Sequence, residues 1–255
     1  MELIHPSSIF NIMTDPVKIN SELFNQVDFE RMGIDFDVTL AIEISKKKVK
    51  TDSDNELLNV LWDNSLSVGA KTYLKSIAKS ICYDYKKEID IKEFSKGKMC
   101  EEAGIELINQ VYFKSYKKHS GRIETDFMSG ECDIFVENQL IRDVKNAWSL
   151  DTFPVFIEDA HSSKYEFQLR AYMHLYDVPK AFLDWVLVDT PEELIRYEPL
   201  ELHRVSHIDP GLRVTSVMYE RDIAIEKKML IRCREAQLYI EKMKKQILID
   251  HNYSY

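Results

Sequence analysis

Residues Gly130–Ser149, GECDIFVENQLIRDVKNAWS, carry the most informative pattern in the chain. They include two short runs rich in β-branched and aromatic residues, Cys132–Val136 and Leu140–Val144. Such runs are typical of β-strands, and the polar residues Glu137–Gln139 between them are typical of a tight connection. The stretch therefore predicts a β-hairpin, around which the rest of the chain can be placed.

The register of this hairpin would bring charged side chains together. With a connection of three residues, Val136 faces Leu140. Counting outward along both strands then places Asp133 opposite Asp143. Lys145 lies two residues after Asp143, so both side chains leave the same face of their strand. Two carboxylates and one ammonium group are therefore expected to converge.

Carboxylates this close need a chemical reason. Like charges are unfavourable in a dry site, whereas a hard cation such as Mg²⁺ takes oxygen ligands and would hold both. One or two such ions supply what phosphodiester hydrolysis needs: a nucleophilic water, a polarised phosphoryl oxygen and a stabilised leaving oxygen. Lys145 would orient the attacking water or help to deprotonate it. The alternative is that Asp143 and Lys145 form an ordinary surface ion pair.

Two further features favour the catalytic interpretation. Glu101 and Glu102 stand at a predicted helix start, from which a carboxylate would reach the metal directly or through water; the alternative is a solvated first turn, where acidic residues are favoured. Gln168 and Tyr172 lie four residues apart and share one helix face. Gln168 would bind the attacking water or a phosphate oxygen, and Tyr172 would contact the substrate backbone or brace the site. The alternative for this pair is an ordinary amphipathic helix.

The spacing of apolar residues predicts the other elements. Residues 55–88 show helical periodicity, and Gly69 is expected to mark a break between two helices. A short helix following Ser7 or Ser8 is expected to stop before Pro16. The remaining expected elements, in order, are an extended segment at Val38–Ile44, a helix at about Lys98–Asn109, strands at Val111–Phe113 and Ile123–Phe127, a helix at about Lys164–Leu175, a strand at Ala181–Val188 and a long helix at about Glu220–Ile249.

This order of elements indicates an α/β fold in which a central mixed β-sheet is flanked by helices. We expect a single domain over residues 1–255. Its parts would be a helical N-terminal region at about 1–95, a core with the charged residues at about 96–190 and a helical tail with a long C-terminal helix at about 191–255.

The composition is that of a soluble globular protein, with 45% hydrophobic and 30% charged residues in 255. Apolar runs are too short for a transmembrane helix, and the N-terminus MELIHPSSIF lacks the pattern of a secretory signal. The cysteines are scattered and form no C-x-x-C pair, which favours free thiols in a reducing cytoplasm. They are Cys82, Cys100, Cys132 and Cys233.

The net charge of −9 argues against a nucleic-acid partner, because phosphate contacts need lysine and arginine. Whole-chain charge is a poor guide, however, where carboxylates gather around a metal ion that reverses their field. Basic clusters are present, and each of them fits a solvated face as well as a binding surface. They comprise Lys46, Lys47, Lys48 and Lys50; Lys114, Lys117 and Lys118; and Lys227, Lys228, Arg232 and Arg234.

Taken in order, these features resemble the PD-(D/E)XK nuclease superfamily, and more closely the YqaJ-type viral exonucleases, relatives of lambda exonuclease. The resemblance covers roughly residues 5–190 and implies a restriction-endonuclease-like core. Each motif is weak alone, and the combination is specific. The matching stretches are SSIFNIMTDP, LSVGAKTYLKSIAKSICY, KGKMCEEAGIEL, GECDIFVENQLIRDVKNAWS, TFP at 152–154 and YEFQLRAYM at 165–173.

The resemblance implies roles for individual residues. Asp133, Asp143 and Glu101 match the family's metal ligands, with Glu102 as the less favoured neighbour of Glu101. Lys145 matches the catalytic lysine, and Gln168 and Tyr172 match a Q-x-x-x-Y helix that serves catalysis and DNA contact. Ser7 aligns with a serine that helps to hold a DNA 5′-phosphate, although no supporting arginine is obvious near it.

The family further implies a Mg²⁺-dependent exonuclease, with Mn²⁺ able to substitute, acting 5′→3′ on linear duplex DNA in viral or prophage recombination. Implied partners are DNA, a single-strand annealing protein and further copies of this chain, in the cytoplasm of a bacterial host and without a membrane. The cysteine cluster of related iron–sulfur nucleases is missing, so we expect no such cluster. The alternatives are a structure-selective or single-strand endonuclease of the same fold, and a catalytically silent DNA-end-binding module.

Overall fold

The computed structural model describes residues 2–16, 37–63, 65–85 and 91–253, which form two compact units. The first unit comprises residues 1–4, 8–86 and 223–255, and the second comprises residues 5–7 and 87–222. All candidate site residues fall in the second unit. The expected boundary near residue 190 does not coincide with the end of this unit, and the expectation of one domain over the whole chain stays a prediction.

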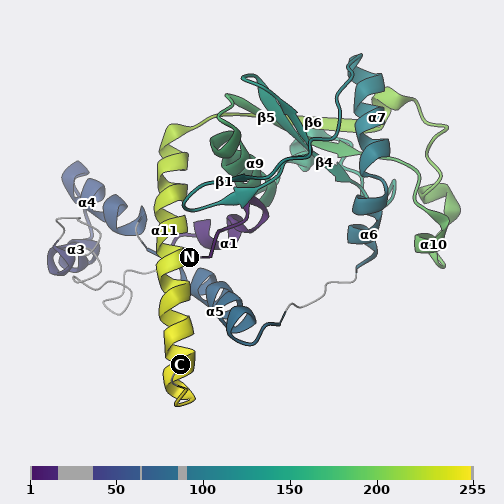
Figure 1. Cartoon of the computed structure of the whole chain (residues 1–255). Helices are drawn as coiled ribbons and strands as arrows, with labels where there is room; N and C mark the ends of the chain where they lie inside the picture. The colour runs from purple at the N-terminus through teal and green to yellow at the C-terminus, as the bar shows by residue number, and fades with distance from the viewer. Residues whose placement is uncertain (1, 17–36, 64, 86–90, 254–255) are drawn as a thin grey trace. The chain divides into compact units, whose positions relative to one another are not determined.

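The second unit is built on a four-stranded mixed sheet in the order β3-β4-β5-β6 (Figure 1). Strand β3 (Ile134–Val136) pairs antiparallel with β4 (Leu140–Asn146). Strand β4 pairs parallel with β5 (Lys180–Val186), and β5 pairs antiparallel with β6 (Val214–Glu220). The α/β fold with a central mixed sheet is therefore confirmed.

The hairpin has the predicted register. Val136 pairs with Leu140, and Ile134 pairs with Arg142. The connection closes with a hydrogen bond of 3.0 Å from the Gln139 amide to the Val136 carbonyl. Asp133 comes one residue before the first paired residue of β3, so the same register leads it toward Asp143 on β4.

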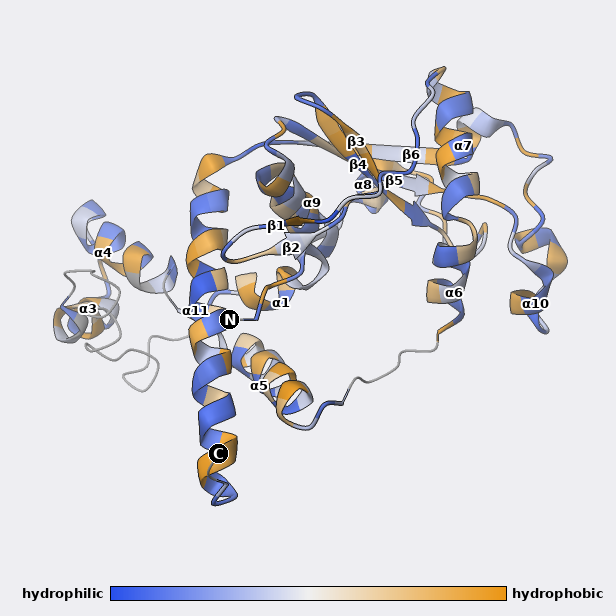
Figure 2. Cartoon of the chain, viewed as in Figure 1, coloured by the Kyte–Doolittle hydropathy of each residue, from blue (hydrophilic) through white to orange (hydrophobic). Residues whose placement is uncertain are grey.

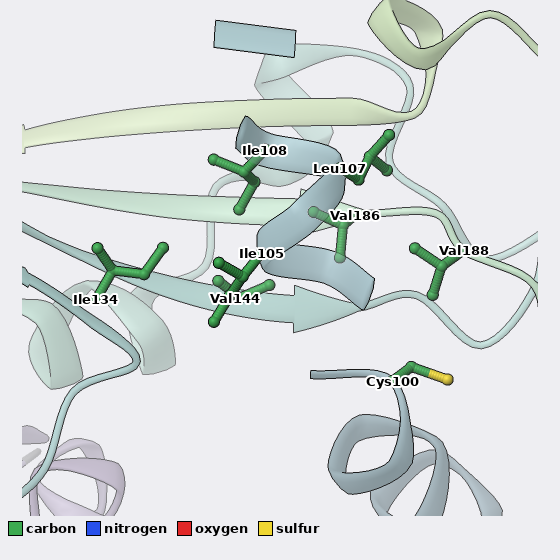
Figure 3. Packing of buried hydrophobic residues seen from close by; sticks show 8 residues of the cluster. All are labelled: Cys100, Ile105, Leu107, Ile108, Ile134, Val144, Val186 and Val188. Atoms are coloured by element: carbon green, nitrogen blue, oxygen red, sulfur yellow. The ribbon is translucent and has the colours of Figure 1, made fainter. Parts of the chain in front are cut away.

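Helices cover both faces of this sheet. On one face lies α7 (Glu101–Tyr112), whose Ile105 and Ile108 pack against Val144 and Val186 of the central strands (Figure 3). A Cβ on Gly104 of α7 would lie 3.0 Å from a methyl carbon of both Val144 and Val186. Only glycine therefore lets the helix approach the sheet this closely.

The opposite face carries α9 (Ser163–Tyr176), which connects β4 to β5 as a parallel crossover requires. Arg142 and Val144 of β4 contact the α7 side, whereas Asp143 contacts Gln168 of α9. Because side chains alternate along a strand, β4 places Arg142 and Val144 under α7 and presents Asp143 and Lys145 to α9. The shorter elements of this unit are α6 (Lys92–Met99), β1 (Ile123–Glu124), β2 (Ser129–Gly130), α8 (Ile157–Ala160), α10 (Glu192–Ile195), η3 (Leu200–Leu202) and η4 (Pro210–Leu212), with η1 (Pro6–Ser8) at the N-terminus.

The described part of the first unit is helical. Its elements are α1 (Phe10–Met13), α3 (Val38–Ser45), α4 (Asp52–Asp63), α5 (Val68–Cys82) and α11 (Ile223–Asp250). Hydrophobic and hydrophilic segments alternate along α11 (Figure 2), whose bounds confirm the predicted long helix near the C-terminus. None of the helices in the described ranges is long and apolar enough to span a membrane.

Arg232 of α11 does not lie on a solvated face, which was one interpretation of the basic cluster Lys227, Lys228, Arg232 and Arg234. Its side chain is fully buried, and its guanidinium donates to the carbonyl oxygens of Ile12 at 3.1 Å and Asp63 at 2.9 Å. It also donates to the Asp15 carboxylate at 2.6 Å, and Lys228 pairs with the same carboxylate. These two residues thus hold the helices of the first unit together and are not part of a solvated face.

Several predicted elements were wrong in type or extent. Val38–Ile44 is helical rather than extended, because the Asp37 carboxylate caps α3 by accepting from the Leu40 amide. The predicted strand Val111–Phe113 is the last turn of α7, which ends at Phe113 in the left-handed region. Strand β6 lies in the segment expected to be a helical tail.

Two boundaries also differ from the sequence prediction. The helix expected from Lys98 is split at Cys100, where α6 ends and α7 begins. Gly69 lies in the first turn of α5 and does not separate two helices. Ser67 is the N-cap that starts α5, since its hydroxyl accepts from the Ala70 amide at 3.1 Å.

Candidate active site

The candidate site forms where the hairpin faces α9, and Asp143 lies at its centre. The Asp143 side chain is almost fully buried. Its Oδ1 accepts a hydrogen bond of 3.1 Å from Gln168 Nε2, and its Oδ2 lies 2.6 Å from Lys145 Nζ. Strand β4 positions both charged groups because they are two residues apart, and α9 supplies the amide that orients the carboxylate.

Asp133 reaches the same place from the other side of the hairpin. Its Oδ2 accepts a hydrogen bond of 2.6 Å from the backbone amide of Val144, the residue between Asp143 and Lys145. Burial, followed by the negative charge of Asp143, raises the pKa of Asp133 to about 7. Lys145 and the Val144 amide act in the opposite direction. The two aspartates therefore share one site, and their mutual repulsion is built into it.

Lys145 carries the positive charge of the site. Burial disfavours its ammonium form, yet the carboxylates of Asp143 and Asp133 outweigh burial and raise the pKa of Lys145 above its usual value. Its Nζ also lies 5.0 Å from the centroid of the Tyr165 ring. An ammonium held this firmly donates hydrogen bonds and stabilises negative charge. Both predicted roles of Lys145, orienting the attacking water and helping to deprotonate it, stay predictions.

Gln168 and Tyr172 occupy neighbouring turns of α9, as predicted, and both are buried. Gln168 Nε2 lies 3.5 Å from the Tyr172 hydroxyl in addition to its bond with Asp143. Burial, followed by the charge of Asp143, raises the pKa of Tyr172, so the phenol is neutral. Gln168 thus holds Asp143 directly, and Tyr172 contacts Gln168. Their predicted contact with DNA stays a prediction.

Glu101 begins α7 and is bound away from the aspartates. Its Oε2 lies 2.8 Å from Lys118 Nζ, although its charge contributes to raising the pKa of Asp133. Glu101 is half-buried whereas Glu102 is exposed, which favours Glu101 as the acid that faces the site. Within the described ranges, no three His, Cys, Asp or Glu side chains are grouped closely enough to hold a metal ion.

Ser7 lies on the N-terminal segment beside β2. His5 Nδ1 is 3.0 Å from the Ser129 carbonyl oxygen, and a Cβ on Gly130 would lie 2.6 Å from a ring carbon of Pro6. The absence of a side chain at Gly130 therefore lets this segment lie against β2. Ser7 itself is exposed, and its predicted contact with a DNA 5′-phosphate stays a prediction.

The donor set at the two aspartates fits a divalent cation. Both donors are carboxylates, the ligands that Mg²⁺ and Mn²⁺ prefer. Among the described residues, the buried Oδ2 of Asp143 accepts no hydrogen bond of regular geometry, although Lys145 lies close to it. The carboxylate of the buried Asp143 and that of the half-buried Asp133 beside one ammonium also leave an excess of negative charge. A cation between Asp133 and Asp143 would give Oδ2 of Asp143 a further partner and offset this charge.

Sequence reasoning missed two residues at the site. Lys118 appeared only as one member of a basic cluster, and its pairing with Glu101 depends on a loop whose path no local pattern predicts. Tyr165 was part of a matching stretch but received no role. Its position three residues before Gln168, on the same face of α9, was the available signal.

Comparison with solved structures places this architecture among exonucleases. The chain resembles a phage-related exonuclease from Haemophilus somnus 129PT, with 26% identity over 96% of both chains and a TM-score of 0.75. An alkaline exonuclease from Laribacter hongkongensis shares the fold at 12% identity, over 96% of this chain and 93% of that one, with a TM-score of 0.55. The same enzyme in complex with dAMP aligns at 15% identity over 71% and 86% of the two chains, with a TM-score of 0.51. No protein family and no curated protein matches the sequence.

Proposed function

We propose that this chain is a member of the PD-(D/E)XK nuclease superfamily and a metal-dependent DNA exonuclease that degrades linear duplex DNA in the 5′→3′ direction. One observation carries the proposal: Asp133 and Lys145 converge on the buried Asp143 at the β3–β4 hairpin, where Gln168 of α9 holds the Asp143 carboxylate. A surface ion pair has no need of this burial or of the Gln168 amide.

The residues divide the work of phosphodiester hydrolysis among them. Asp133 and Asp143 would hold the divalent ion, with Glu101 as a further ligand. The bound ion supplies a water activated for attack and positive charge at the phosphoryl oxygens. The Lys145 ammonium would orient that water and offset the charge that develops on the phosphate. Gln168 would keep Asp143 in the orientation that serves the ion.

End-labelled substrates test this proposal directly. Linear duplex DNA labelled at the 5′ end should release its label at once as mononucleotide in Mg²⁺ or Mn²⁺. Duplex labelled at the 3′ end should shorten gradually, because a 5′→3′ enzyme reaches that label last. Covalently closed circular DNA of the same sequence should stay intact.

Exonuclease action, direction, metal dependence and catalysis would each be contradicted by a different result. Cutting of closed circles at a rate similar to that of linear DNA would indicate an endonuclease. Early release of the 3′ label would reverse the direction, and full activity in excess chelator would exclude the metal mechanism. DNA binding without cleavage under any of these conditions would indicate a DNA-end-binding module.

The proposal extends to partners and assembly. We expect DNA affinity to weaken steeply with salt, because each neutralised phosphate releases counterions. We also propose that the chain forms a homo-oligomer and acts beside a single-strand annealing protein in the cytoplasm of a bacterial host. Light scattering after size exclusion measures the oligomer, and co-elution with a candidate annealing protein measures the partnership.

A further inference from the structure

Lys118 is held at the candidate site by the architecture of its loop. Before it, the Asn109 side chain forms two hydrogen bonds with the backbone of Tyr116, at 2.7 Å and 2.9 Å, which fasten the loop to α7. After it, the His119 amide donates to the carbonyl oxygen of Asp133 at 2.7 Å. The backbone on both sides of Lys118 is thus fixed, and one fixed point is the backbone of Asp133 itself.

From this position the Lys118 ammonium forms an ion pair with the Glu101 carboxylate. The contact between Lys118 Nζ and Glu101 Oε2 is 2.8 Å, and the side chains are 48% and 23% exposed respectively. The carboxylate is therefore neutralised by an ammonium and is not grouped with the two aspartates. The ammonium is still half open to solvent, where a phosphate oxygen can reach it.

We propose that Lys118 is a positioning residue that couples DNA binding to metal binding. Without DNA, its ammonium pairs with Glu101 and keeps this carboxylate from the metal. When DNA binds, a phosphate pairs with the Lys118 ammonium instead and releases Glu101. The inference rests on the proposed nuclease function and adds a regulatory contact to it. With Lys118 engaged by phosphate, Glu101 is free to join Asp133 and Asp143 as a ligand. Thermodynamic linkage makes the effect reciprocal, so that metal binding also releases Lys118 for DNA.

The expected coupling is modest. Ion pairs with this degree of exposure stabilise weakly, since solvent and salt screen them. We expect the Lys118–Glu101 contact to lower the metal affinity of the DNA-free protein by about two- to fivefold, which corresponds to the usual strength of such pairs. Direct ligation of the metal by substrate phosphate would add to the coupling and would remain without Lys118.

Calorimetric titration of Mn²⁺ into the full-length protein tests the inference, with and without a phosphorothioate duplex that resists cleavage. Lys118→Met should bind Mn²⁺ about two- to fivefold more tightly than wild type without DNA. The gain in Mn²⁺ affinity caused by the duplex should be smaller than in wild type by a similar factor. Lys117→Met is the matched control, because it removes the same charge from the neighbouring exposed lysine and should leave both quantities at wild-type values.

A double-mutant cycle makes the assignment specific. With Glu101→Gln in place, adding Lys118→Met should no longer change Mn²⁺ affinity, since no carboxylate is left to release. Equal Mn²⁺ affinities of wild type and Lys118→Met, or equal effects of Lys117→Met and Lys118→Met, would overturn the inference. Failure of wild type to bind the duplex would instead overturn the proposed nuclease function.

Discussion

Nζ of Lys145 lies 2.6 Å from Oδ2 of Asp143, in a contact that is buried between β4 and α9. The same carboxylate is fixed at Oδ1 by Gln168, so the ion pair has one defined geometry. Exposed pairs of this kind contribute little and break easily. A buried pair with a third partner is costly to form, which suits a site that must hold charge ready for a reaction.

Replacement of Lys145 by methionine should separate catalysis from binding. The side chain keeps most of its volume and loses its charge, so the attacking water and the developing phosphate charge lose their donor. We expect the single-turnover rate to fall by about 10²-fold or more, while Mn²⁺ binding and DNA binding are retained. Lys180→Met at the exposed start of β5 is the control and should cleave at the wild-type rate.

Asp133→Asn supplies the complementary result. An asparagine can still accept from the Val144 amide, so the fold should persist, but it removes the charge of a metal ligand. Calorimetry should show Mn²⁺ binding lost or weakened together with cleavage. Near-native cleavage by the Lys145→Met protein would remove Lys145 from the mechanism, and unchanged Mn²⁺ affinity in Asp133→Asn would remove Asp133 as a ligand.

Tyr165 is expected to position Lys145. Its ring lies 5.0 Å from the ammonium and contacts the Trp185 ring edge-on at a centroid distance of 5.6 Å. Loss of a partly buried cation–π contact costs about 1–2 kcal/mol, so Tyr165→Leu should lower the turnover rate by about tenfold. Tyr165→Phe retains the ring and should restore most of the rate. Equal rates for the two variants would show that the ring has no role, and DNA affinity measured alongside should not change in either.

Alanine substitutions at Gly97 and Gly104 should change the free energy of unfolding in opposite directions. A Cβ on Gly104 would meet methyl carbons of Val144 and Val186 at 3.0 Å, whereas a Cβ on Gly97 of α6 would meet nothing within 4 Å. Gly97→Ala should stabilise by about 0.5–1 kcal/mol through helix propensity. Gly104→Ala gains the same propensity but overpacks the core at a cost of about 1–3 kcal/mol. Urea unfolding should therefore rank Gly97→Ala as more stable than Gly104→Ala, and the reverse order would show that α7 can move away from the sheet.

The burial of Lys96 predicts that the free energy of unfolding depends on pH. Its side chain is fully buried and donates to the carbonyl oxygens of Trp148 and Val188, both at 3.0 Å. Burial lowers the pKa of Lys96 to about 8, below its value in the unfolded chain. Between about pH 8 and pH 10.4 the unfolded chain keeps a proton that the folded chain has lost, so this residue makes stability rise with pH.

The expected size of this rise is about 3 kcal/mol, from a pKa difference of roughly 2.4 units at about 1.4 kcal/mol each. Other groups titrate in the same range, so the measurement is the difference in the free energy of unfolding between wild type and Lys96→Met. This difference should change between pH 8 and 10 and be constant from pH 6 to 7. A difference that stays flat over the whole range would show that Lys96 is not desolvated.

Local sequence patterns determined the register of the β3–β4 hairpin and the shared face of Gln168 and Tyr172 on α9. In the hairpin, a short polar connection and the alternation of side chains are enough to define which residues pair. The sequence therefore predicts that Asp133, Asp143 and Lys145 lie close together, as they do in the structure. The same holds for Gln168 and Tyr172, because helical periodicity puts residues four apart on one face. These relationships need only the chain's own repeat and no distant partner.

Tertiary structure decided what depends on distant contacts. Strand β6, VTSVMYE, contains β-branched and aromatic residues, and its place in the sheet depends on its pairing with β5, which lies nearly thirty residues earlier in the chain. Arg232 reads as a surface charge, yet the carbonyl oxygens of segments more than a hundred residues away make it a buried one. Lys118 likewise meets Glu101 only because a loop is fastened to Asp133. Periodicity specifies which face a residue shares with its neighbours, whereas burial and charge pairing depend on which other segment covers that face.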